Sequence, residues 1–173
     1  FRSLNNEKIV LASAFSALFF VASFIHIPFG PTQIHLMLLG FIGVFLGSVA
    51  IFSISLALIL QALLLGFGGV SSIGVNVLIM GLASYLVYII FKLNFLKALN
   101  EKVKFFLIGF SGFFISTFIL FIHLIFSKDE YEKLSYTIIF ANIPTMILEG
   151  LVTLFLFLYI KKTMPSLLKG LNI

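Results

Sequence analysis

The segment 103–127 reads VKFFLIGFSGFFISTFILFIHLIFS and holds a single charged residue, Lys104, near its start. A helix needs about 20 mostly apolar residues to cross the hydrocarbon core of a bilayer, and this segment is long enough to do so. In lipid every backbone amide and carbonyl must be paired within the protein, and a helix meets that need inside one segment. A run of this length favours a helix over the shorter, alternating strands of a membrane barrel. We therefore predict a transmembrane helix here.

Five further apolar runs lie on either side of this segment, and they cover residues 8–26, 34–48, 49–66, 75–93 and 136–160. The run 34–48 is short and meets the next one at Gly47 without a polar loop, which also suits a helical hairpin that stops below the headgroups. The chain of 173 residues is 61% hydrophobic and only 10% charged, too little charge for the surface of a soluble domain. We predict an all-α fold: a polytopic transmembrane bundle of about six helices, forming one membrane-embedded domain over residues 1–173.

The basic residues divide unevenly between the two sides of the predicted membrane protein. If each run crosses once, one side holds nine of them, Arg2, Lys8, Lys92, Lys97, Lys102, Lys104, Lys161, Lys162 and Lys169, and the other side holds Lys128 and Lys133. By the positive-inside rule the first side is cytoplasmic. Because these residues flank apolar runs, the net charge of +5 indicates orientation in a membrane and gives no indication of nucleic-acid binding.

Three connections are then predicted on the outer side, at 28–33, 66–76 and 127–135. The first two carry no charge and are rich in Gly and Pro, which indicates shaped loops, partly inserted, that line a cavity. The chain begins with Phe1, so we expect a segment upstream of it. A further helix there would place the native amino terminus outside.

Polar side chains that could bind a ligand gather near these outer connections. His26, His35 and His123 each lie near the outer end of a run, and Gln33 and Asn76 are predicted on the same side as His35. An imidazole near the interface is commonly an anchor or a hydrogen-bonding group, and that reading suits His26 and His123. His35 is the better ligand candidate because an uncharged turn precedes it. With no cysteine in the chain, any metal must be held by nitrogen and oxygen, and one histidine alone does not make a site.

Glu149 is the only acidic residue inside a predicted span, and an intramembrane carboxylate is a functional candidate by default. It follows Asn142 by about two helical turns, so the two side chains share a face, and Pro144 between them could kink the helix. The alternative is that Glu149 and Asn142 pair with neighbouring helices, and for Gln61 such a packing role is the favoured reading. Gly40, Gly43, Gly47, Gly109 and Gly112 allow close helix packing or could form a docking face.

Enzymatic function is not indicated by the sequence. It contains no GxxxxGK[ST] nucleotide-binding loop, so the chain does not couple ATP hydrolysis by itself. Neither a Ser/His/Asp arrangement nor a paired carboxylate site is evident, and the outer polar residues resemble a binding site.

Several ordered motifs closely resemble the CbiM/NikM family, the substrate-binding components of cobalt and nickel energy-coupling-factor (ECF) transporters. They are IHIPFGPTQIHL at 25–36, LQALLLGFGG at 60–69, GVNVLIMG at 74–81, and NIPTMILEG at 142–150 followed by Lys161, Lys162 and Pro165. The resemblance implies a seven-helix protein of the prokaryotic cell membrane, and the distribution of basic residues predicts a cytoplasmic carboxyl terminus. Its extracellular amino terminus would begin Met-His. Many members of the family have His at the position that Asn142 matches, so a metal role for Asn142 is in doubt.

The resemblance also implies a site and partners. The amino terminus would supply an amine, an amide nitrogen and an imidazole, and His35 would supply a fourth nitrogen, giving a near-square-planar site for the transported Co²⁺ or Ni²⁺. In the family, the loop that matches the one ending at Asn76 covers or braces this site. From their place in the sequence, Gln33, His26, Gln61 and Glu149 are further candidates for supporting residues. The implied partners are a transmembrane scaffold subunit, two ATP-binding subunits and a small accessory membrane protein.

Two alternatives stay open at this stage. A vitamin-binding component of the same architecture would need an aromatic pocket for an organic ligand, and the chain has no Trp. An assembly factor or intramembrane enzyme would use Glu149 and the outer histidines.

Overall fold

The structure is a computed structural model that describes residues 6–29, 32–93, 98–127, 131–169 and 171. The helices are α1 (Asn6–Ala22), α2 (Leu39–Leu46), α3 (Ala50–Leu65), α4 (Ile73–Asn76), α5 (Leu82–Phe91), α6 (Glu101–Ile125), α7 (Glu132–Ala141), α8 (Ile143–Thr163) and α9 (Pro165–Lys169). Short 3₁₀ turns at Gly47–Val49 and Val70–Ser72 precede α3 and α4, and a π-helical turn at Val77–Gly81 leads into α5. Strands β1 (His26–Phe29) and β2 (Thr32–His35) form an antiparallel hairpin.

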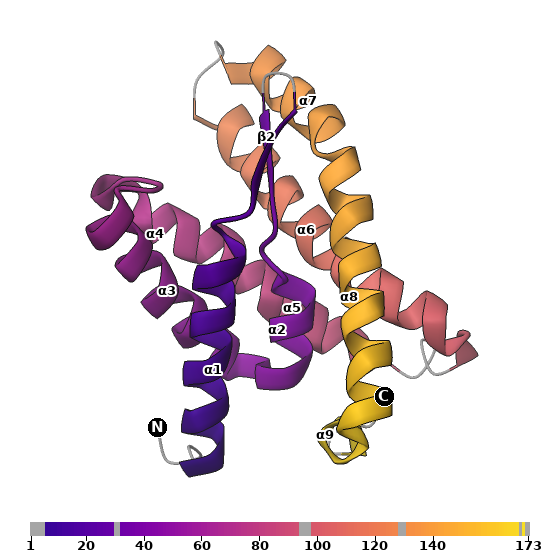
Figure 1. Cartoon of the computed structure of the whole chain (residues 1–173). Coiled ribbons are helices and arrows are strands. Elements are labelled where there is room, and N and C mark those ends of the chain that lie inside the picture. Colours follow the sequence, from indigo (N-terminus) through magenta and orange to yellow (C-terminus); the bar gives the residue numbers. More distant parts are fainter. Residues whose placement is uncertain (1–5, 30–31, 94–97, 128–130, 170, 172–173) are drawn as a thin grey trace.

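The predicted helical membrane bundle is confirmed. Four segments are long and apolar enough to cross a membrane: Leu39–Leu65, Val70–Phe91, Glu101–Ile125 and Glu132–Thr163. A shorter apolar helix covers Lys8–Ala22. The first of the four changes direction at Gly47, where φ is 58°, so that α2 and α3 run in different directions (Figure 1). The first segment contains two helices, α2 and α3, and so corresponds to two of the predicted runs. The other three segments and the shorter helix correspond to the remaining four runs.

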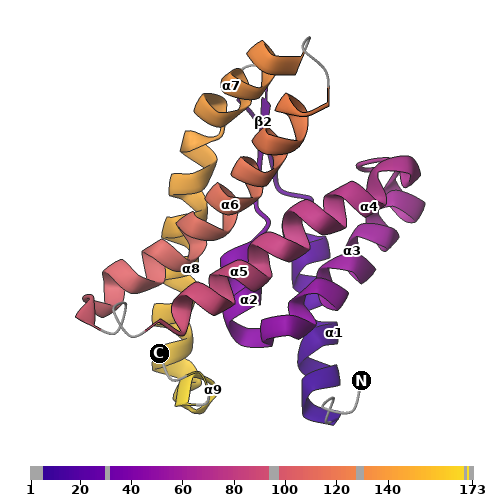
Figure 2. The ribbon, with the colours of Figure 1, turned by 180° about the vertical axis from the view of Figure 1, so that it is seen from behind.

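The two ends of the molecule differ in their elements (Figures 1 and 2). We call the end that holds the β-hairpin and α7 the hairpin end. We call the opposite end, which holds the start of α1 and α9, the lysine end. The chain therefore begins and finishes its described helices at the same end, as the even number of predicted runs requires.

Three predicted boundaries differ from the structure. The first run stops being helical at Ala22, and His26 already belongs to β1. The run 34–48 is the end of a strand followed by a helix of eight residues. Proline has no N–H to donate, and a PFGP sequence before the run favours a hairpin over a helix. The last run divides at Asn142 into α7 and α8, with Pro144 in the first turn of α8, where its missing N–H costs nothing.

Glycines let α2 lie at the centre of the bundle. A side-chain carbon added at Gly40 would overlap the carbonyl oxygen of Ile108 on α6, and one added at Gly112 would overlap the backbone nitrogen of Gly40. At Gly43 the added carbon would overlap the carbonyl oxygen of Ser84 on α5. The predicted close-packing role of these glycines is therefore confirmed, and it explains how a short helix is enclosed by longer ones.

Aromatic rings of four helices pack together around α2. Phe105 of α6 stacks on Phe157 of α8 with ring centroids 4.5 Å apart, and Phe157 contacts Phe41 and Phe45 of α2. Phe15 of α1 packs against the same two α2 rings. This cluster ties the start of α6 and the end of α8 to α1 and α2.

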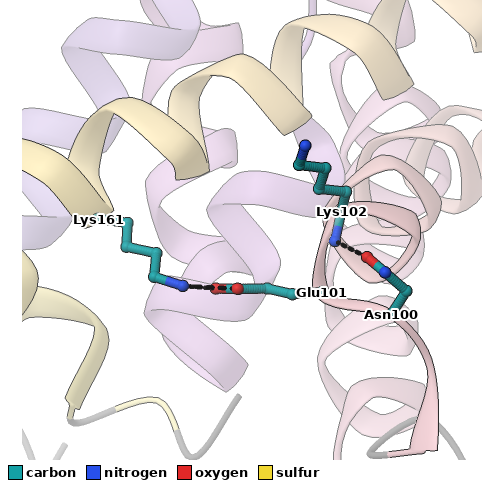
Figure 3. A network of polar contacts seen from close by, with 4 residues as sticks. All are labelled: Asn100, Glu101, Lys102 and Lys161. Carbon is teal, nitrogen blue, oxygen red and sulfur yellow. Dashed lines mark hydrogen bonds and ion pairs between the residues drawn. The ribbon is translucent and has the colours of Figure 1, made fainter.

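At the lysine end α6 and α8 are joined by polar contacts (Figure 3). The side chain of Asn100 caps α6 by accepting a hydrogen bond of 3.0 Å from the backbone N–H of Lys102. The Lys161 ammonium on α8 contacts both carboxylate oxygens of Glu101 at 2.7 and 2.6 Å. Both side chains of the pair are about half exposed.

Candidate metal-capture cavity

A cavity of about 480 Å³ lies between the end of α1, β2, α3 and the segment that leads into α5. Its wall is mixed, with four polar side chains among apolar ones. The lining residues are Ser23, His35, Leu58, Gln61, Phe67, Gly68, Asn76 and Met80. Three of the residues singled out in the sequence, His35, Gln61 and Asn76, are therefore brought together although they come from three separate segments.

His35 reaches the cavity from the end of the β-hairpin. It is the last residue of β2, and the hairpin register places it opposite His26. Its ring is half-buried and meets Phe113 of α6 edge to face, with centroids 6.4 Å apart. A strand end held by pairing on one side and by an aromatic contact on the other presents an imidazole with little freedom. The side chains of His26 and Gln33, both predicted as supporting residues, lie outside the described part of the chain.

Gln61 and Ser23 form a buried polar pair in the cavity wall. The Gln61 amide nitrogen donates a hydrogen bond of 2.8 Å to the Ser23 hydroxyl oxygen, and the Ser23 hydroxyl donates to the carbonyl oxygen of Phe20 at 2.6 Å. Both residues are nearly fully buried. Gln61 thus links α3 to the end of α1, as the favoured packing role predicts, and it also lines the cavity. Ser23 was not singled out in the sequence, because a lone serine at a helix end carries no distinctive pattern.

Asn76 lies where the glycine-rich loop returns to the bundle. A side-chain carbon added at Gly68 would come within 2.9 Å of the Asn76 amide nitrogen. Gly68 also has φ of 71°, a conformation that glycine adopts at little cost. The loop therefore approaches Asn76 as closely as the absence of a side chain permits, and the loop and Asn76 together close one side of the cavity.

Glu149 does not line the cavity but contacts the chain just after His35. Its carboxylate accepts hydrogen bonds from the backbone N–H groups of Met37 and Leu38, the latter at 3.1 and 3.0 Å. Glu149 is only 1% exposed. Leu38 has φ of 53°, a left-handed conformation that costs a non-glycine residue about 1–2 kcal/mol. Because these amides lie at the start of α2, where backbone N–H groups lack partners within the helix, the carboxylate stabilises both the helix start and the strained turn.

The remaining sequence candidates lie away from the cavity lining. His123 is exposed near the end of α6, and its carbonyl oxygen accepts from Ser127. Asn142 points its amide at the Thr117 hydroxyl at 3.5 Å, the outer limit for a hydrogen bond. Asn142 and Glu149, which were predicted to share a helix face, therefore contact different elements: Asn142 contacts α6, and Glu149 contacts the start of α2.

Within the described ranges no group of three or more His, Cys, Asp and Glu side chains could hold a metal ion. The cavity brings one imidazole, two amide side chains and one hydroxyl to its wall. Imidazole nitrogen suits divalent first-row metals such as Co²⁺ and Ni²⁺. Among the polar side chains of the cavity wall, the His35 imidazole is the one best suited to such a metal.

Comparisons with known proteins bear on this arrangement. The family model CbiM, "Cobalt uptake substrate-specific transmembrane region", matches residues 1–167. A Haemophilus influenzae protein named for metal transport is 28% identical over 174 residues, covering 96% of this chain and 83% of that protein. The cobalt transport protein CbiM of Clostridium tetani is 31% identical over 119 residues, which cover 62% of this chain and 47% of that protein.

The fold has a solved counterpart as well. The crystal structure of a truncated transition metal transporter matches 93% of this chain and 84% of that chain with a TM-score of 0.77 and 23% identity, which shows a shared fold. The family match favours metal transport over the vitamin-binding and intramembrane-enzyme alternatives. From its sequence and its fold, this chain is a membrane component of cobalt or related metal transport and belongs to the CbiM family.

Proposed function

We propose that the chain is the substrate-capture subunit of an ECF-type importer and that it binds Co²⁺ through His35. The observation that carries this proposal is the cavity that places the His35 imidazole beside the Gln61 and Asn76 amides. The lining residues include no Asp or Glu, and nitrogen donors hold a divalent metal without the strong attraction of carboxylates. Release of the cargo to a partner is then feasible.

The other metal ligands would come from a Met-His amino terminus upstream of residue 1, as the family resemblance implies. Its amine, amide nitrogen and imidazole would complete a near-square-planar set with His35. Such a set also suits Ni²⁺, so nickel is the second cargo to test. Asn76 and Gln61 would brace the threaded terminus by hydrogen bonds within the cavity.

Energy for uptake would come from partner subunits. We propose a transmembrane scaffold subunit, two ATP-binding subunits and a small accessory membrane protein. The hairpin end would face outward and the lysine end the cytoplasm, because the positive-inside rule places the basic side inside. The cytoplasmic connection at 94–104 and the carboxyl tail would contact the partners; of these, residues 94–97, 170 and 172–173 lie outside the described part of the chain.

The first test is a titration of the purified full-length protein with Co²⁺, followed by the d–d absorption of the bound ion. His35→Ala should lower the affinity by more than about 100-fold, beyond the 10–100-fold loss that is usual when only an outer-shell partner is removed. His123→Ala is the matched control, since that histidine is exposed on α6 away from the cavity. Wild-type binding by His35→Ala would remove His35 as a ligand, and equal losses in both variants would indicate nonspecific binding.

A further inference from the structure

Glu149 places a carboxyl group in the protein interior without a described cationic partner. Among the residues that the structure describes, the one salt bridge joins Lys161 and Glu101. The Glu149 carboxylate instead ends on the amides of Met37 and Leu38. Removing a charge from water is costly, and a neutral residue could cap a helix at lower cost. A carboxylate at this position must therefore provide a property that a neutral capping residue lacks.

Two convergent acceptors are what distinguish a carboxylate at this position. Met37 and Leu38 are consecutive, and Leu38 donates toward both Glu149 oxygens while Met37 donates toward one. An ionised carboxylate has only acceptors, whereas the amide of glutamine turns a donor toward one side. Charge-assisted hydrogen bonds are also stronger than neutral ones. Glu149 thus holds two successive amides in one fixed orientation.

The clamped turn directly follows the metal-ligand candidate. His35 ends β2, Leu36 follows, and Met37 is the first clamped residue. On its other side His35 is fixed by the hairpin register, and its ring by the contact with Phe113. The backbone at His35 is therefore held from both directions, and Glu149 supplies the hold on the α2 side.

We infer that Glu149 is a positioning residue for metal capture, which sets the direction of the His35 imidazole by clamping the Met37–Leu38 turn. This inference rests on the proposed function, in which His35 binds the ion. A ligand held by its neighbours keeps a metal in one geometry, and loss of such support commonly lowers metal affinity 10- to 100-fold. Glu149 does not itself contact the metal in this account.

The test compares three variants of the full-length protein in Co²⁺ titrations read by d–d absorption, which reports coordination geometry as well as occupancy. Glu149→Gln keeps the shape but replaces one acceptor by a donor, and Glu149→Asp keeps both acceptors on a shorter side chain. Ser84→Ala is the matched control. The Ser84 hydroxyl donates to the Leu39 carbonyl oxygen of α2 at 2.7 Å, so this substitution removes another buried hydrogen bond to the same helix.

We expect Glu149→Gln to shift the d–d bands and to weaken Co²⁺ binding 10- to 100-fold, with a smaller change for Glu149→Asp. Ser84→Ala should keep the wild-type bands. Unchanged bands in the folded Glu149 variants would overturn the inference, whatever their affinity. Failure of both Glu149 variants to fold while Ser84→Ala folds would also overturn it, by showing a purely structural role. If instead wild-type protein shows no Co²⁺ signal, or His35→Ala retains it, the proposed function itself has failed.

Discussion

Two glutamates in different parts of the bundle carry the same group in contrasting surroundings. Glu101, at the lysine end, is 45% exposed and pairs with Lys161, which is 52% exposed. Glu149, in the half of α8 toward the hairpin end, is 1% exposed and contacts only neutral amides among its described hydrogen-bond partners. The exposed carboxylate has a full opposite charge within 2.6 Å, while the buried one has none described.

An opposite charge nearby is therefore a poor guide to how much an acidic residue contributes to the stability of the fold. At the surface, water and salt screen the attraction, and such pairs contribute about 0–1 kcal/mol. In the interior a hydrogen bond is electrostatically stronger, and a donor left without its acceptor is costly. We therefore expect the neutral contacts of Glu149 to matter more than the ion pair of Glu101.

The largest effect is expected for Glu149→Ala. The variant leaves the buried amides of Met37 and Leu38 without their acceptor, and each unsatisfied donor costs about 1–3 kcal/mol. We predict a loss of about 2–6 kcal/mol in the free energy of unfolding, measured by chemical denaturation in detergent micelles. Stability within about 1 kcal/mol of the wild type would show that water replaces the carboxylate and would break the comparison.

An intermediate effect is expected for Gln61→Leu, which tests a neutral pair in the same buried half. Loss of the bond to Ser23 should lower stability by about 1 kcal/mol and Co²⁺ affinity by about tenfold, the lower bound for an outer-shell partner. Ser55→Ala on α3 is the control, because its hydroxyl bonds locally to the Ile51 carbonyl. A tenfold loss in Ser55→Ala as well would point to a general weakening of α3.

The smallest effect is expected for Glu101→Gln. Stability should fall by less than about 1 kcal/mol, and the fall should vanish in high salt. Co²⁺ affinity should not change, since the residue lies at the far end of the bundle. A double-mutant cycle with Lys161→Gln isolates the pair, and Lys162→Gln on the same helix is the control. A coupling energy well above about 1 kcal/mol would mean that the ion pair stabilises the fold about as much as the Glu149 hydrogen bonds, contrary to this prediction.

Much of the architecture could be predicted from the sequence because hydrophobic length decides which segments cross a membrane. The long uncharged segment within α6 and the glycines at 40 and 112 each carry a local signal, and the structure confirms both. The division of the last run at Asn142 was not predicted, because Pro144 gave the expected kink two residues later. A proline in a first helical turn is compatible with either reading.

The hairpin and the clamp could not be predicted in the same way. Strands of four residues around PFGP are too short to establish an alternating pattern. The partners of Glu149 are backbone amides more than 100 residues away in sequence, and a backbone amide looks alike at every position. The cavity was anticipated from the uncharged, glycine-rich outer connections and from the polar residues near them, but not its full lining. Ser23 and Met80, which also line the cavity, could be identified only from the three-dimensional structure.

The clamp between α2 and α8 joins Met37 and Glu149, 112 residues apart. During synthesis the hairpin and α2 leave the ribosome long before the last span is made. The turn after His35 therefore cannot reach its final form until α8 has entered the bilayer. A nascent chain or a fragment lacking that span would have the histidine but not a rigid place for it. Under the proposed function, capture of the metal would depend on completion of the protein, and incompletely made copies would not retain the metal.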